Sequence, residues 1–198
     1  MKDVWKVYFN GSFGGKSPDG SHPGQVLKLN HKFRFAGRDW YVPAAYLTAK
    51  GLVLDILMRA DKAVLEDFCK KWEHLEDEDV PNDVFEQAER ENPLAFEFSP
   101  QIELNGQTLP FSQGHGLSYH PLFQNAAACE PALDEHGESD FDTPTERAII
   151  DRYGLDSEDG WAIHRYSFPW KTKRRPKSIS SLALTLTPQP GRVPGAEF

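Results

Sequence analysis

Alternating apolar and polar side chains are the clearest pattern along this chain. Residues 27–35 alternate without interruption, and residues 161–170 and 179–187 show the same period of two. Because successive side chains of a β-strand point to opposite faces, this pattern predicts strands with one buried and one solvated face. Two shorter runs flank Asn105 and Gly106, the dipeptide that most strongly indicates a tight hairpin. With further runs over residues 5–9, 40–42, 51–59 and 94–98, the chain is expected to contain about nine strands.

Helical spacing of apolar residues is confined to about three short stretches. Residues 62–75 place apolar side chains on one helical face, and Asp61 precedes them as a candidate N-cap. A second short helix is expected to begin at Asn82 and a third at Thr143, where a capping box precedes the apolar positions. The strands neighbour one another rather than alternating with helices, so we expect an α+β fold built on mostly antiparallel or mixed β-sheet.

The order of these elements favours one domain. Residues 1–187 are expected to form a single α+β domain, followed by a C-terminal tail over residues 188–198 that is rich in proline and glycine. The alternative is a boundary near residue 92, because each half contains strands and at least one helix.

Charge and composition narrow the classes of function. The 198-residue chain has a formal net charge of −8, which opposes a general affinity for nucleic acid or for an anionic membrane. Its apolar stretches are far shorter than the roughly 20 residues of a membrane helix, and its first residues lack the apolar region of a signal peptide. We therefore expect an acidic, soluble, cytoplasmic protein in which Cys69 and Cys129 are reduced thiols.

Asp55 departs most clearly from the folding pattern. It interrupts residues 51–59, a run that is apolar on both faces of the expected strand, and a buried carboxylate requires a partner. His31 also occupies a position where the pattern favours an apolar side chain. If their strands are neighbours, Asp55 would orient the imidazole of His31 for general-base catalysis. The alternative is a structural ion pair or hydrogen bond between Asp55 and Arg59, Arg34 or a tyrosine.

A second candidate site lies in the loop-rich segment over residues 112–142. Imidazole and thiolate are the usual ligands of zinc, and the segment supplies His115, His120, Cys129 and His136. The four, eight and six residues between successive members match no standard zinc motif. We therefore predict no cofactor, and the alternative to a metal site is a set of surface histidines in a long loop.

The third candidate is a basic loop over residues 171–177 that follows Trp170. It carries five cations, Lys171, Lys173, Arg174, Arg175 and Lys177. Basic and aromatic side chains together are typical of surfaces that bind single-stranded nucleic acid. They are equally typical of a solvated hairpin tip, and the acidic chain as a whole disfavours nucleic acid.

The sequence favours a non-catalytic binding or interaction domain over an enzyme, because no nucleophile motif accompanies the candidate residues. A protein partner, or self-association through an edge strand or through oppositely charged loops, is the expected interaction. The first alternative is a small metal-assisted hydrolase that uses His115 and His120. The second is contact with nucleic acid through residues 171–177. The sequence identifies no membrane partner and no small molecule.

Overall fold

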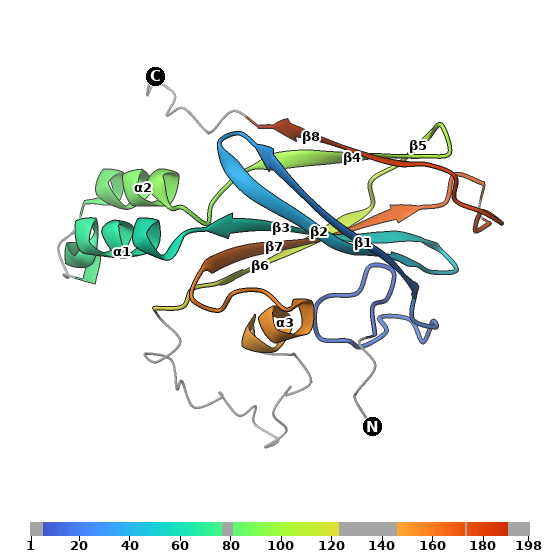
Figure 1. Cartoon of the computed structure of the whole chain (residues 1–198), viewed down its shortest axis with the longest axis horizontal. Helices are drawn as coiled ribbons and strands as arrows, with labels where there is room; N and C mark the ends of the chain where they lie inside the picture. The colour runs from blue at the N-terminus through green and yellow to red at the C-terminus, as the bar shows by residue number, and fades with distance from the viewer. Residues whose placement is uncertain (1–5, 77–80, 123–145, 173, 190–198) are drawn as a thin grey trace, which may run out of the picture.

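Two antiparallel β-sheets organise the chain (Figure 1). The computed structural model describes residues 6–76, 81–122, 146–172 and 174–189. The larger sheet has five strands in the order β1 (Gln25–Phe35), β2 (Arg38–Leu47), β3 (Gly51–Ala60), β7 (Gly160–Pro169) and β6 (Gln113–Tyr119). The smaller sheet has three strands in the order β5 (Gln107–Leu109), β4 (Phe98–Leu104) and β8 (Leu182–Pro188). The expected α+β class with antiparallel sheet is confirmed, and the eight described strands are close to the expected nine.

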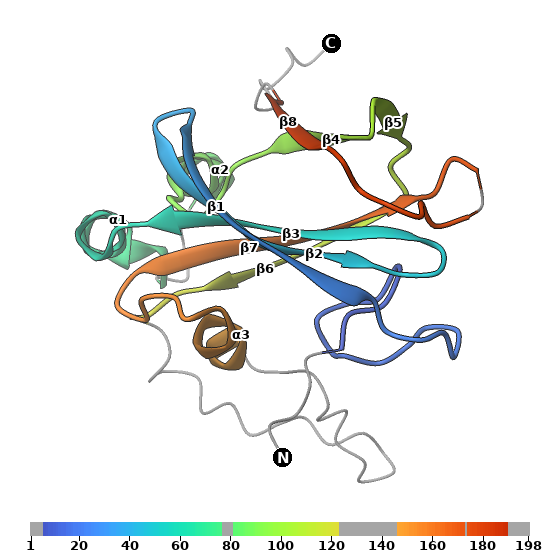
Figure 2. The same cartoon turned by 45° about the vertical axis from the view of Figure 1, so that its right-hand side comes forward.

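Three α-helices accompany the sheets, namely α1 (Lys62–Lys71), α2 (Asn82–Glu91) and α3 (Glu146–Tyr153). A short 3-10 helix (Glu73–Glu76) follows α1. The helices α1 and α2 lie side by side at one end of the sheets, whereas α3 lies beneath the five-stranded sheet (Figure 2). Within the described ranges, no helix has the length and apolar character needed to cross a bilayer.

The inner strands β3 and β7 of the five-stranded sheet are buried on both faces. One face packs against the three-stranded sheet, where Leu54 and Ile56 of β3 share a core with Ile102 of β4. The other face is covered by α3 and by the segment that precedes β1, and Figure 2 shows these three layers in profile. β3 therefore has apolar side chains on both faces, as its sequence predicts.

The shortest connection between the two sheets lies along one side. There, β5 leads through residues 110–112 directly into β6. On the opposite side, β1 and β8 are the outermost strands of their sheets, and they are not paired with each other in the described structure. The sandwich is consequently open between β1 and β8.

Three local features differ from the alternation pattern. Over residues 6–9 the chain forms no strand, although Val7 and Phe9 are buried against the sheet. Pro43 lies inside β2 and does not end the strand. A strand interior normally requires the N–H that proline lacks. Pro43 is accommodated because the register between β2 and β3 shifts between Tyr41 and Ala45. β6 begins at Gln113, so His115 is a strand residue and not the turn residue that its flanking glycines indicate.

Candidate functional site

Asp55 forms a buried ion pair with Arg165. The two residues are directly opposite each other on β3 and β7, and both side chains have 0% exposure. Nε of Arg165 donates to one carboxylate oxygen of Asp55 and Nη2 to the other, each at 2.8 Å. This two-bonded geometry is the strongest that an arginine and a carboxylate form, and it satisfies both charges within the core.

Two tyrosines and the N-terminal segment complete the network around this pair. The hydroxyl of Tyr153 on α3 donates to Asp55 at 2.5 Å and lies 2.7 Å from the hydroxyl of Tyr46 on β2. Nη1 of Arg165 donates to the backbone oxygen of Ser12 at 2.9 Å. These contacts fasten α3 and the segment before β1 onto the same face of the sheet.

The electrostatics of this network keep Arg165 charged and both tyrosines protonated. Burial alone would lower the pKa of Arg165, but the neighbouring carboxylate of Asp55 outweighs burial and raises that pKa. Burial and the charge of Asp55 raise the pKa of Tyr46 to about 12 and the pKa of Tyr153 well above its ordinary value. Both tyrosines therefore keep their protons near neutral pH and act as hydrogen-bond donors.

The structure does not bring His31 to Asp55. His31 lines the same space as Leu54, and the side chain of the next residue on β3, Asp55, points to the opposite face of the sheet. The partners of Asp55 are Arg165 and Tyr153. A tyrosine is one of the partners that the sequence predicts, whereas Arg165 is not. The sequence does contain a sign of this pairing, because Arg165 places a cation on the same face of its strand as the apolar residue Ile163.

The described histidines of the candidate metal cluster are held by separate contacts. Nε2 of His115 lies 2.9 Å from Nε2 of Gln113, whereas Nε2 of His120 lies 3.8 Å from Sγ of Cys69 on α1. Burial lowers the pKa of His120 and raises that of the Cys69 thiol, so both groups are neutral near pH 7. Cys129 and His136 lie outside the described residues. Within the described part of the chain, no three His, Cys, Asp or Glu side chains converge as metal ligands would.

The basic loop presents cations without an aromatic platform. Trp170 is buried, and its indole N–H donates to the backbone oxygen of Thr48 at 3.1 Å. Lys171, Arg174 and Arg175 are exposed, and Lys173 lies outside the described residues. Nη2 of Arg175 donates at 2.5 Å to the side-chain oxygen of Gln25, the first residue of β1. The loop therefore lies against the beginning of β1 and leads into the beginning of β8.

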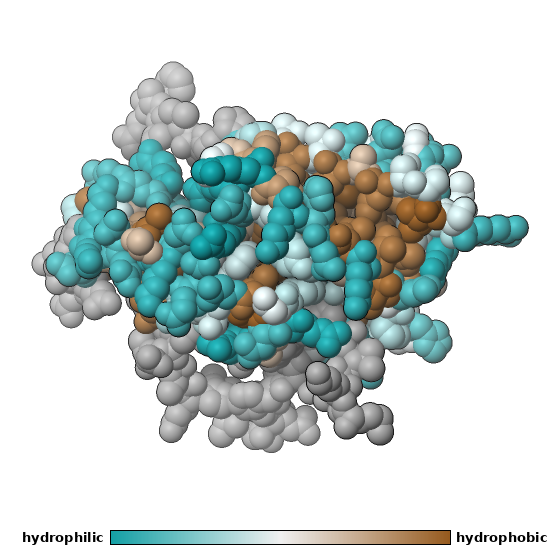
Figure 3. Space-filling view, viewed as in Figure 1, coloured by the Kyte–Doolittle hydropathy of each residue, from teal (hydrophilic) through white to brown (hydrophobic). Residues whose placement is uncertain are grey.

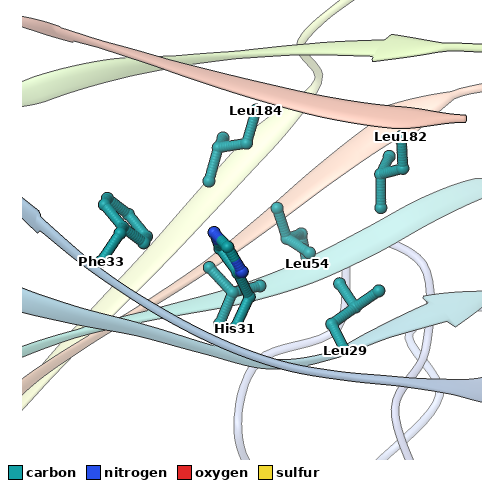
Figure 4. Close-up of a pocket in the computed structure, with 7 residues that line it drawn as sticks. Leu29, His31, Phe33, Leu54, Leu182 and Leu184 are labelled. Carbon is teal, nitrogen blue, oxygen red and sulfur yellow. The ribbon is translucent and has the colours of Figure 1, made fainter.

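The open side of the sandwich contains a groove of about 510 Å³, which is within the range of ligand sites. Side chains from β1 and β8 point toward one another across it, with Leu54 of β3 between them (Figure 4). Its lining consists of Leu29, His31, Phe33, Val42, Leu54, Leu182 and Leu184. Figure 3 shows hydrophobic surface in this region, bordered by hydrophilic side chains. We call this space the β1–β8 groove.

Comparison of the chain with known protein families, with curated proteins and with solved structures finds no match.

The Asp55–Arg165 pair generates a stability prediction. Replacing Arg165 by Met leaves a buried carboxylate without its cation, which should lower the free energy of unfolding by about 3–5 kcal/mol. Adding Asp55→Leu to Arg165→Met should recover most of this loss, because well-packed apolar residues can replace a buried ion pair. Urea unfolding of both single variants and of the double variant measures the coupling. Additive losses in the double variant would contradict the arrangement.

A second prediction concerns His164, which lies on β7 between the rings of Phe98 and Tyr166. Burial lowers the pKa of His164 to about 4, below the 6.5 of an unfolded histidine. As the pH falls, the unfolded chain takes up this proton first, so stability should be retained above about pH 6.5 and lost toward pH 4 by up to about 1.4 kcal/mol per pH unit.

The variant His164→Phe should reduce this acid sensitivity, as measured by urea unfolding between pH 7.5 and pH 4.5. The exposed residue His22 provides the control, since His22→Gln should leave the pH profile unchanged. Equal profiles for wild type and His164→Phe would show that His164 is not held neutral by burial.

Proposed function

We propose that this chain is a non-catalytic binding domain and that its binding site is the β1–β8 groove. The observation that carries the proposal is the open side of the sandwich, where an apolar groove lies between two edge strands that are not paired with each other. Open apolar surface bordered by polar side chains is typical of interaction sites.

The chemistry of the groove supports binding rather than catalysis. Of the seven described lining residues, His31 is titratable and the other six are apolar. A general base acts on a nucleophile or a water molecule that a second polar group orients. The described lining supplies no carboxylate, hydroxyl, thiol or amine for that role. Asp55, the nearest buried carboxylate along the sequence of β3, points away from the groove and is bound to Arg165.

The lining also supplies a driving force for binding. Leu29 and Phe33 on β1 and Leu182 and Leu184 on β8 remain partly exposed. Each Å² of apolar surface that a ligand removes from water contributes about 25 cal/mol. An elongated apolar group that lies along the groove would cover side chains of both strands at once, so we expect it to bind more favourably than a group that contacts one strand.

The proposal predicts saturable binding of Nile red, an uncharged apolar dye, with an increase in its fluorescence. Leu184→Asp places a charge in the groove and should weaken binding by about tenfold or more, because burying an unpaired carboxylate is unfavourable. Thr185→Asp is the matched control, since Thr185 is the next residue of β8 and is exposed on its outer face. It should bind the dye as the wild type does.

Thermal melts of both variants establish that they are folded, and Leu29→Asn gives a second test from the β1 side of the groove. The absence of saturable dye binding, or equal losses in Leu184→Asp and Thr185→Asp, would overturn the proposal.

A further inference from the structure

The backbone of β8 has a free edge at the border of the groove. Asn105 donates to the backbone oxygen of Ser181 and Gln189 donates to that of Glu97, each at 3.0 Å, so these bonds bracket the β4–β8 ladder. Backbone groups of successive strand residues point to opposite sides. Residues 183, 185 and 187 therefore face β4, whereas Leu182, Leu184 and Leu186 direct their N–H and C=O groups to the outer edge. β8 pairs with β4 alone among the described strands.

The two strands that border the groove differ in how they protect their edges. β1 carries Lys28, Lys32 and Arg34, and its register with β2 shifts between Lys28 and His31, where Asn30 has a positive φ of 49°. Cations and bulges of this kind discourage pairing with another strand. Between Leu182 and Thr187, where the sequence contains only leucine, alanine and threonine, β8 has neither device, and Pro188 blocks pairing only at the last position of the strand. β8 is therefore the edge that is open to an additional strand.

A strand added to β8 would have a defined side-chain pattern. Its inward side chains would lie beside Leu182 and Leu184 and opposite Leu29 and Phe33 of β1, which favours apolar residues at alternate positions. Its outward side chains would continue the surface formed by Thr185 and Thr187, which favours polar residues. Main-chain hydrogen bonds give affinity and alternate side-chain pockets give specificity in this mode of recognition.

The positive charge at one end of the groove predicts acidic residues in the ligand. Lys171, Arg174 and Arg175 are exposed on the loop that leads into β8, and the bond from Arg175 to Gln25 holds this loop beside the beginning of β1. Opposite charge on a ligand would be attracted to this end. The described strand pairs of this protein are all antiparallel, and a ligand strand antiparallel to β8 would place its C-terminal end near Leu182.

Resting on the function proposed above, we infer that the ligand of the groove is an extended segment of a partner protein that pairs with β8 as a fourth strand. The segment alternates apolar and polar residues and carries acidic residues at its C-terminal end. The basic loop of residues 171–177 then recognises an acidic peptide.

The inference is tested with a phage-displayed library of random dodecapeptides selected on the full chain. Selected peptides should alternate apolar and polar residues and end in Asp or Glu. The best of them, synthesised with a fluorescent label, provides the probe for anisotropy titrations.

Leu184→Pro and Leu184→Ala form the decisive pair of variants. Both remove the leucine side chain, but only proline removes the N–H that faces the free edge, and an edge strand tolerates proline at such a position. Leu184→Pro should bind the peptide about tenfold more weakly than Leu184→Ala, as expected for the loss of one well-formed hydrogen bond. Arg174→Ser combined with Arg175→Ser should weaken binding at low salt and reduce its salt dependence.

If Leu184→Pro does not fold, N-methylation of single amides of the peptide gives the same information with the wild-type protein. Only every second amide of a paired peptide would bond to β8, so methylation should weaken binding at alternate positions. Failure to select any peptide, or equal affinities for Leu184→Pro and Leu184→Ala, would overturn the inference. If Nile red still binds in the groove, the site survives and its ligand is a small apolar molecule. If Nile red does not bind either, the proposed function fails as well.

Discussion

The ion pair between Asp55 and Arg165 is the constraint that sets how the larger sheet is aligned, because neither charge can stay buried without the other. It joins the central strand of the larger sheet, β3, to the neighbouring strand β7 by two hydrogen bonds within the core. A shift of either strand by one residue would move one of the two charges to the opposite face, so the pair specifies the register of β3 and β7. Through Tyr153 and Ser12 the same pair fixes the layer that covers this face of the sheet. The opposite face of the sheet, which packs against the three-stranded sheet, is the face on which the β1–β8 groove lies.

The position of the groove follows from how the strands are divided between the two sheets. The link from β5 to β6 joins the sheets along one side, and no described strand joins them between β1 and β8. The apolar side chains of β1 and β8 reach a shared core but remain only partly covered. The two strands that border the groove differ, because β1 carries cations and a register shift that discourage pairing, whereas β8 has neither. This incomplete edge of the architecture is the feature on which the proposed binding function rests.

Much of the sheet could be predicted from local sequence, whereas the sites could not. The alternation over residues 27–35 and the Asn105-Gly106 dipeptide correspond to β1 and to the β4–β5 hairpin, because strand alternation and tight turns depend on neighbouring residues. Asp55 was identifiable as a carboxylate that needs a partner, but Arg165 lies 110 residues away and is paired with it only by the sheet. Gly114 indicated a turn, yet the ring of Tyr166 lies 2.8 Å from where its Cβ would be, so close packing explains the glycine.

Amide hydrogen exchange of the ligand-free protein tests the central claim most directly, because the claim rests on an open backbone edge in β8. The account predicts that the amides of Leu182, Leu184 and Leu186 exchange rapidly, while those of Ala183, Thr185 and Thr187, which face β4, are protected. This alternation within one strand would establish that the outer edge is unoccupied and accessible. Uniform protection along β8 would contradict the account, since it would show that the edge is already covered in the free protein.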